Sequence, residues 1–194
     1  MPCSRASKAL VNSVLFLAPV IGQSPLVEGN AASPVRVVVY EDLQCPDCAE
    51  FRRMMDEKLL PKYAANVAFE HRDFPLPKHA WARPAAIAAR YFAGVKPELG
   101  VEFRRETMAR RRAIKADTFE HHVAAFAAAH GLKPEDAVAG LKDEKLAALV
   151  EKDYQEGIAR GIARTPTALV NGEPFIETFT FEEISAAIER ELKQ

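Results

Sequence analysis

The chain has few cysteines and almost no net charge. Its 194 residues include three cysteines, too few for a scaffold held together by disulfides. The formal net charge of −1 gives no support to nucleic acid as a partner. A hydrophobic content of 48% and a charged content of 27% are ordinary for a globular protein. We therefore expect one domain, with room for an insertion.

The first 22 residues have the pattern of a targeting segment. Arg5 and Lys8 precede a mostly apolar run from Ala9 to Ile21. This run is too short to cross a bilayer as a stable helix, and a basic start before it is typical of a signal peptide. We expect residues 1–22 to be a cleaved signal peptide and the protein to be exported, to the periplasm or the cell envelope. The alternative is the N-terminal helix of a cytoplasmic protein.

Two of the three cysteines lie where a strand is followed by a helix. Residues 35–40 are apolar and β-branched, which predicts a buried strand. Apolar residues recur at helical spacing after Cys48, and Pro46 suits the first position of a helix. A Cys-x-x-Cys pair at such a junction is typical of a redox motif.

The position of the pair assigns different roles to the two thiols. The unpaired N–H groups and the dipole of a helix N-terminus favour a thiolate at Cys45, which would be the nucleophile. Cys48, one turn further along, would resolve the mixed disulfide. A zinc site is the alternative, but it needs two more ligands, and His71, the nearest histidine, is not suitably spaced. We expect no metal and no other cofactor.

The remaining elements predict an α/β fold with helices in its middle. Residues 67–71 predict a second strand, parallel to the first. His79 to Arg160 is helical in pattern, and Asn171-Gly172 predicts a hairpin between strands 167–170 and 173–176. The order β-α-β, helices, β-β-α is that of a thioredoxin fold with an inserted α-helical domain. The expected division is residues 23–75 with 161–194 for the fold, and 76–160 for the insertion.

Three further segments carry weaker predictions. The helix from Pro46 to about residue 65 is expected to kink or restart at Pro61. Residues 24–34 are expected to be a polar, turn-rich lead-in before the first strand. The arginine-rich stretch 104–115 favours a solvated helix face, with a docking patch for an acidic partner as the alternative.

Several motifs occur in an order that identifies a family. They are Gly29-Asn30-Ala31, Glu41-Asp42-Leu43-Gln44-Cys45-Pro46-Asp47-Cys48, Arg72-Asp73-Phe74-Pro75-Leu76, Trp81-Ala82-Arg83-Pro84-Ala85-Ala86 and Thr165-Pro166-Thr167. Together they resemble the DsbA-like thiol–disulfide oxidoreductases, over about residues 25–192. The resemblance implies a thioredoxin fold with a helical insertion, no metal, and electron exchange with substrate proteins through their cysteines. It also implies a redox partner protein, which could be membrane-bound.

The resemblance gives a role to Thr165 and Pro166. It implies that Pro166 follows a cis peptide bond and lies against the cysteine pair. It also implies that Thr165 offers its backbone to an extended substrate segment, a mode of binding that is independent of sequence.

Asp47 and Val39 depart from the family pattern. Strongly oxidising DsbA enzymes carry histidine in place of Asp47, and a carboxylate there opposes the Cys45 thiolate by roughly half a pKa unit if exposed. Val39 occupies the position at which these folds commonly place a buried carboxylate. We hypothesise that Glu41, or failing that Asp42, accepts the proton of the Cys48 thiol.

The predicted function is thiol–disulfide exchange between the Cys45–Cys48 pair and substrate proteins, in the direction of dithiol oxidation. Because of Asp47, we expect this protein to be a weaker oxidant than DsbA. A reductase or isomerase of the same fold is the alternative within this class. A non-catalytic peptide-binding or chaperone module is the alternative from another class.

Overall fold

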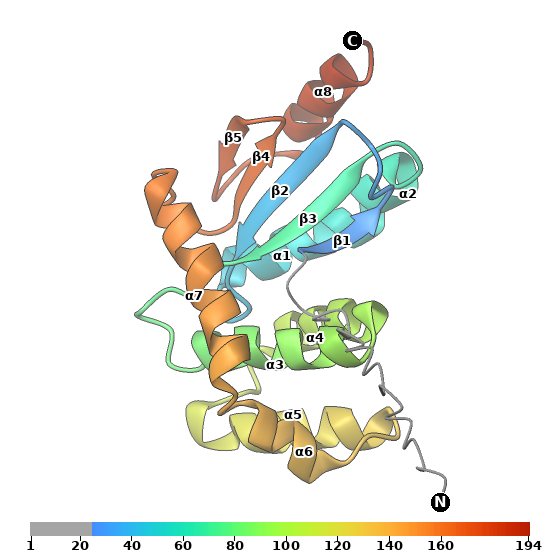
Figure 1. Cartoon of the computed structure of the whole chain (residues 1–194). Helices are drawn as coiled ribbons and strands as arrows, with labels where there is room; N and C mark the ends of the chain where they lie inside the picture. The colour runs from blue at the N-terminus through green and yellow to red at the C-terminus, as the bar shows by residue number, and fades with distance from the viewer. Residues whose placement is uncertain (1–24) are drawn as a thin grey trace, which may run out of the picture.

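The computed structural model describes residues 25–194 and contains one mixed sheet in the order β1-β3-β2-β4-β5 (Figure 1). Strands β2 and β3 are parallel, and the other neighbouring pairs are antiparallel. The strands are β1 (Leu26–Gly29), β2 (Arg36–Glu41), β3 (Ala68–Asp73), β4 (Thr167–Val170) and β5 (Glu173–Ile176). The predicted signal peptide, residues 1–22, lies outside the described residues.

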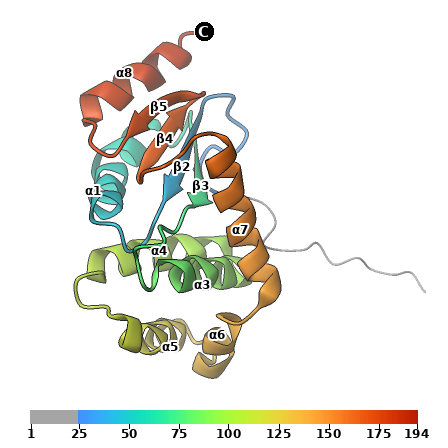
Figure 2. The ribbon, with the colours of Figure 1, turned by 90° about the vertical axis from the view of Figure 1, so that its left-hand side faces the viewer.

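Helices cover both faces of the sheet and one of its ends. The α-helices are α1 (Pro46–Met54), α2 (Leu60–Tyr63), α3 (Ala82–Val95), α4 (Pro97–Arg110), α5 (Phe119–Ala129), α6 (Pro134–Gly140), α7 (Glu144–Ala159) and α8 (Phe181–Glu191). Figures 1 and 2 show α1 and α7 on opposite faces of the sheet, with α3 to α6 gathered beyond its lower end. Because α3 to α7 all lie between β3 and β4 in the chain, the expected thioredoxin fold with a helical insertion is confirmed.

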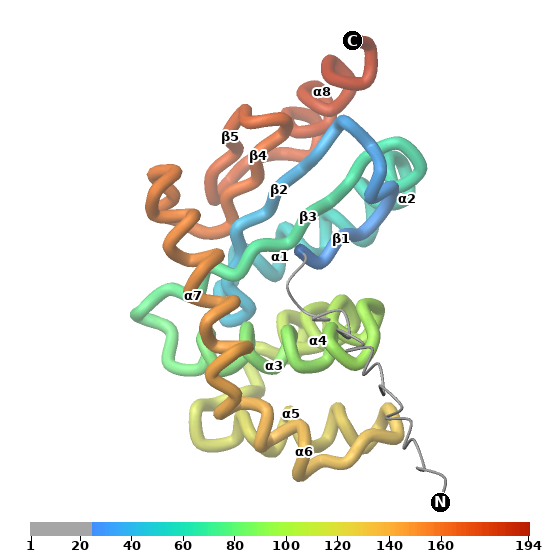
Figure 3. The backbone as a smooth tube through the Cα atoms, in the orientation of Figure 1, coloured from blue at the N-terminus to red at the C-terminus, as the bar shows by residue number. Residues whose placement is uncertain are grey.

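Two hydrophobic cores meet near the cysteines. The larger core of the sheet packs Val37, Val39 and Ile184 with the inner face of α1. The core of the inserted helices contains Cys45 and Cys48 together with Trp81, Phe92 and Phe103. The cysteine pair therefore lies where the thioredoxin fold contacts its insertion. The tube of Figure 3 shows the turn after β2 reaching the level of α3.

Two local features follow from special backbone requirements. Asn171 and Gly172 both have positive φ, 43° and 99°, as the predicted hairpin turn requires. Gly157 of α7 lies so close to the sheet that an added Cβ would meet the Phe74 ring at 2.6 Å. Phe74 stacks on Tyr154 and is buried, so it belongs to the core on this face of the sheet.

Two expectations about the first half of the chain were incomplete. Residues 24–34 are more than a turn-rich lead-in, because Leu26–Gly29 forms a first strand, β1, which pairs with β3 at the edge of the sheet. Four residues are too few to display an alternating pattern, so this pairing depends on the exposed edge of β3. The helix that begins at Pro46 continues to Tyr63, and its irregular part is a π-helical turn at Met55–Leu59, just before Pro61.

Among residues 25–194, no helix combines the length and the apolar composition needed to span a bilayer.

Candidate active site

Cys45 lies at the start of α1, in extended conformation, directly before the first helical residue, Pro46. Its backbone N–H donates to the Asp42 carbonyl at 3.0 Å, and its own carbonyl accepts from Ala49 N–H at 3.2 Å. These bonds fix the nucleophile at the helix N-terminus, where unpaired N–H groups favour an anion. Both Cys45 and Cys48 are free thiols in this structure, and both are buried.

The segment before β4 lies against the first cysteine. The peptide bond between Thr165 and Pro166 is cis, as expected. The Cys45 thiol donates to the Thr165 carbonyl oxygen across a sulfur–oxygen distance of 3.4 Å. Four predicted site residues, Cys45, Cys48, Thr165 and Pro166, are therefore brought together from positions 120 residues apart.

The two thiols differ strongly in acidity. Hydrogen bonding from the Cys48 thiol, partly opposed by burial and assisted by backbone N–H groups of α1, lowers the pKa of Cys45 to about 6. Burial raises the pKa of Cys48 well above its ordinary value, and the neighbouring Cys45 raises it further. At neutral pH, Cys45 is therefore mostly thiolate and Cys48 is a thiol, which is the division of roles that the sequence predicts.

This difference predicts which cysteine reacts with an alkylating reagent. Since the pKa of Cys45 is lowered, its thiolate persists as the pH falls from 9 to near 6 and is lost below that. We expect iodoacetamide to label Cys45 in the reduced protein with a midpoint near pH 6, and to leave Cys48 unlabelled below about pH 9. Mass spectrometry of the labelled peptide over a pH series measures both. A midpoint at pH 8 or above would contradict the asymmetry.

Pro46 and Asp47 are the exposed members of the motif. The Asp47 backbone N–H stabilises the Cys45 thiolate, which opposes the effect expected of its carboxylate. The net influence of the Asp47 side chain stays a prediction.

Glu41 and Asp42 are both buried, and their carboxylates are occupied by other partners. Glu41 Oε1 accepts hydrogen bonds from His71 Nδ1 and Arg104 Nη1, both at 2.8 Å. Asp42 accepts from the N–H groups of Gln44 and Leu76, and contacts His79 Nδ1 at 2.7 Å. The backbone N–H of Asp42 lies 3.4 Å from Cys48 Sγ. No hydrogen bond joins the Cys48 thiol to either carboxylate, and proton transfer between them remains a prediction.

A buried group of charges surrounds Glu41 and corrects one expectation. Arg104 is not on a solvated face: it is 2% exposed and lies between the carboxylates of Glu41 and Asp73. Burial alone would lower the pKa of Arg104, but Asp73 and Glu41 outweigh it and raise the pKa. Burial likewise opposes the charge of His71, yet Glu41 and Glu28, one at each ring nitrogen, raise its pKa.

The register between β2 and β3 explains why these buried charges lie together. Glu41 and Asp73 end the parallel strands β2 and β3 and are paired in register, so their side chains share one face of the sheet. Two buried carboxylates side by side are unfavourable without a cation. Arg104 of α4 is a cation that both carboxylates share, whereas His71 contacts only Glu41 and Arg90 contacts only Asp73 of the two. Arg104 thereby fixes the inserted helices to the sheet.

Sequence reasoning missed His79 and Gln44. His79 contacts the buried Asp42 carboxylate, and Gln44 Oε1 accepts the N–H of Trp81 at 2.9 Å. Both bonds hold the loop after β3 beside the cysteine pair. A histidine in a loop and a glutamine next to a cysteine carry no pattern from which these contacts could be inferred. Within residues 25–194, no group of three or more histidine, cysteine, aspartate or glutamate side chains is placed to hold a metal ion.

The fold and the cysteine pair define a class of protein, and comparisons with known proteins agree. A family model described as thioredoxin matches residues 23–190. BdbD from Bacillus subtilis, in its oxidised form, has a TM-score of 0.77 and 26% identity over 88% of this chain and 94% of its own. The structure of α-DsbA1 from Wolbachia pipientis has a TM-score of 0.75 and 20% identity, over 87% of this chain and 91% of its own.

The chain belongs to the thioredoxin family. Its predicted resemblance to the DsbA-like thiol–disulfide oxidoreductases is confirmed by these structural neighbours and by the fit of Cys45 and Cys48 to the Cys-x-x-Cys motif. A protein-disulfide isomerase from Novosphingobium aromaticivorans also matches, with a TM-score of 0.66 and 18% identity, over 88% of this chain and 99% of its own. The search of the curated proteins found no match.

Proposed function

We propose that this protein oxidises pairs of thiols in substrate proteins. The observation that carries the proposal is the opposite acidity of two adjacent thiols, one of them 3.4 Å from the backbone of the cis-proline loop. In each cycle the Cys45–Cys48 disulfide accepts two electrons and two protons from a substrate dithiol, which leaves as a disulfide. A redox partner protein then removes the two electrons from the reduced pair.

The acidity of Cys45 supports oxidation as the direction. A stabilised thiolate favours the reduced form of the enzyme and so makes its disulfide a better oxidant. The pKa of about 6 lies between those of thioredoxin, about 7, and DsbA, about 3.5. An intermediate acidity supports an oxidant weaker than DsbA, in agreement with the effect expected of Asp47. Isomerase or reductase activity is the second candidate, and the exposed carboxylate of Asp47 between the two cysteines favours it.

Roles follow for the other residues. Cys45 attacks or is attacked, Cys48 resolves, and the backbone of Thr165 before Pro166 receives an extended segment of the substrate. Pro46 and Asp47 adjust the acidity of Cys45. We propose that the protein is exported, because a dithiol oxidase is useful only where disulfides persist.

The reduction potential of the pair tests the direction. We expect a value between about −270 mV, typical of thioredoxin, and about −120 mV, typical of DsbA. The measurement equilibrates the protein in glutathione buffers and follows the fluorescence of Trp81, the only tryptophan, which packs in the same core as both cysteines. A value at or below that of thioredoxin would favour the reductase or isomerase. A Cys45→Ser/Cys48→Ser variant that kept full activity would instead indicate a peptide-binding module.

A further inference from the structure

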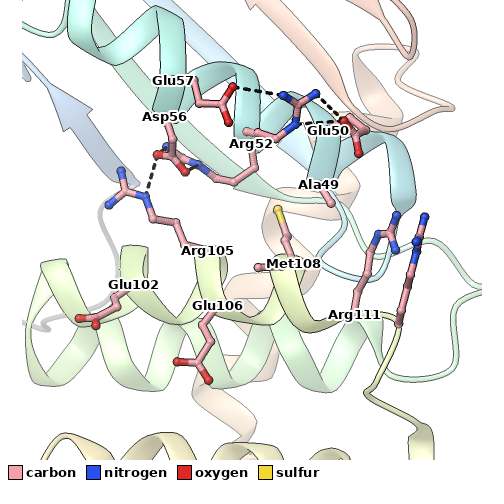
Figure 4. A pocket seen from close by; sticks show the side chains of 13 residues that line it. Ala49, Glu50, Arg52, Asp56, Glu57, Glu102, Arg105, Glu106, Met108 and Arg111 are labelled. Carbon is pink, nitrogen blue, oxygen red and sulfur yellow. Dashed lines mark hydrogen bonds and ion pairs between the residues drawn. The ribbon is translucent and has the colours of Figure 1, made fainter.

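A charged groove lies between α1 and α4, next to the cysteine pair (Figure 4). Its volume is about 690 Å³, within the range of sites that bind small molecules or short peptide segments. Ala49 of α1 lines one end. Because Ala49 follows Cys45 by four residues, the two lie on the same helix face, separated by about 6 Å along the axis. The groove therefore begins one helical turn from the nucleophile.

Most of the arginines in this groove are neutralised by carboxylates. Arg52 and Arg105 each contact both Glu28 and Asp56. Arg53 contacts Glu50 at 2.9 Å and Glu57 at 3.1 Å. The positive charges of these three arginines are therefore balanced by carboxylates of the protein itself.

Arg111 and Arg112 are different. They follow the end of α4, and among residues 25–194 neither has a carboxylate within ion-pair distance. The Nε of Arg111 is buried and has no hydrogen-bond partner in the described part of the chain, which is unfavourable for a charged donor. Figure 4 shows Arg111 reaching towards α1 at the end of the groove where Ala49 lies, with Glu102 at the opposite end. Arg111 thus lies at the end of the groove nearest Cys45, and Arg112, the next residue, lines the same groove.

From this placement we infer that Arg111 and Arg112 bind an acidic side chain of the substrate polypeptide, close in sequence to its reacting cysteine. An extended chain advances about 3.3 Å per residue, so an aspartate or glutamate two or three residues from that cysteine spans the distance to the groove. Paired guanidinium groups suit a carboxylate because each offers two parallel donors. The inference rests on the proposed function and adds to it a preference for substrates with an acidic residue near the cysteine. Backbone binding at Thr165 gives no such preference, because it does not depend on the substrate's side chains.

Two dithiol peptides test the inference. They are identical except for glutamate or glutamine two residues after the first cysteine, and the oxidised full-length protein reacts with each while Trp81 fluorescence reports the rate. We expect the glutamate peptide to react about threefold to tenfold faster at low salt, with the ratio approaching one in 1 M salt, where charges are screened beyond about 3 Å.

Matched variants separate binding from other effects. The carboxylate also alters the reactivity of the peptide's own thiol, so the rate ratio is compared between proteins. R111Q/R112Q is expected to lose the preference. R83Q/R110Q removes two exposed arginines of the same inserted helices, neither of which lines the groove, and is expected to keep it.

An unchanged ratio in R111Q/R112Q would overturn the inference, and so would an equal loss in R83Q/R110Q, which would indicate net charge alone. A variant that slowed both peptides and reduced glutathione equally would show that the arginines act on the cysteine pair rather than on the substrate, and would overturn it too. If the wild-type protein oxidised neither peptide, the proposed function itself would fail. The two failures are therefore distinguishable.

Discussion

Replacing Arg104 with methionine is expected to destabilise the protein by about 3–5 kcal/mol, the usual cost of removing one partner from a buried ion pair. Methionine fills similar space but leaves the buried carboxylates of Glu41 and Asp73 facing each other without their shared cation. The free energy of unfolding, measured in urea for the reduced protein, gives the value. Arg110→Met is the control on the same helix, because the exposed Arg110–Glu106 pair is worth less than about 1 kcal/mol.

The effect of Arg104→Met should depend on pH with a defined sign. Arg104 and Arg90 hold the pKa of Asp73 below its usual range despite burial, and His71 and Arg104 do the same for Glu41. Lowered pKa values contribute stability above the unfolded values of about 4, and this contribution is lost as the pH falls through the folded values. The difference between wild type and variant should therefore shrink below about pH 4. A difference below 1 kcal/mol at pH 7 would show that Arg104 does not hold the insertion to the sheet.

Substituting the two cysteines separately is expected to abolish substrate oxidation in both variants, but by different routes. In Cys48→Ala the Cys45 thiolate still attacks an intrachain disulfide of the substrate, forming one mixed disulfide and leaving the second substrate sulfur as a thiolate on the same chain. Without Cys48 nothing resolves it, so a covalent one-to-one adduct accumulates. In Cys45→Ala the remaining thiol of the pair, Cys48, is 1% exposed and has a raised pKa, so Cys48 forms no adduct at neutral pH.

Mass spectrometry under non-reducing conditions distinguishes the two variants. The mass of the adduct equals the sum of both chains, and reductant releases it. Adduct formation in Cys45→Ala at a rate similar to that in Cys48→Ala would contradict the assigned roles. Cys45→Ala/Cys48→Ala serves as the control for adduct formed elsewhere on the protein.

The sequence alone determined the parts of this protein that depend on neighbours along the chain. The strand, Cys45, Pro46 and the helix are consecutive, so their placement follows from spacing and propensity. The Asn171-Gly172 hairpin is equally local, and the ordered motifs are sufficient to identify the family. The cis peptide bond before Pro166 was predicted from that resemblance.

The tertiary structure decided the features that depend on pairing between distant segments. Arg104 belongs to an arginine-rich helix whose partners, Glu41 and Asp73, lie 63 and 31 residues away on two strands. Nothing local distinguishes it from Arg110, which is exposed. The same holds for β1, which exists because β3 has a free edge with which it pairs. It also holds for Arg111 and Arg112, whose lack of carboxylate partners within residues 25–194 is visible only in the folded protein. The physical reason is common to all: burial and ion pairing are properties of the packed arrangement, whereas helix starts and turns are properties of adjacent residues.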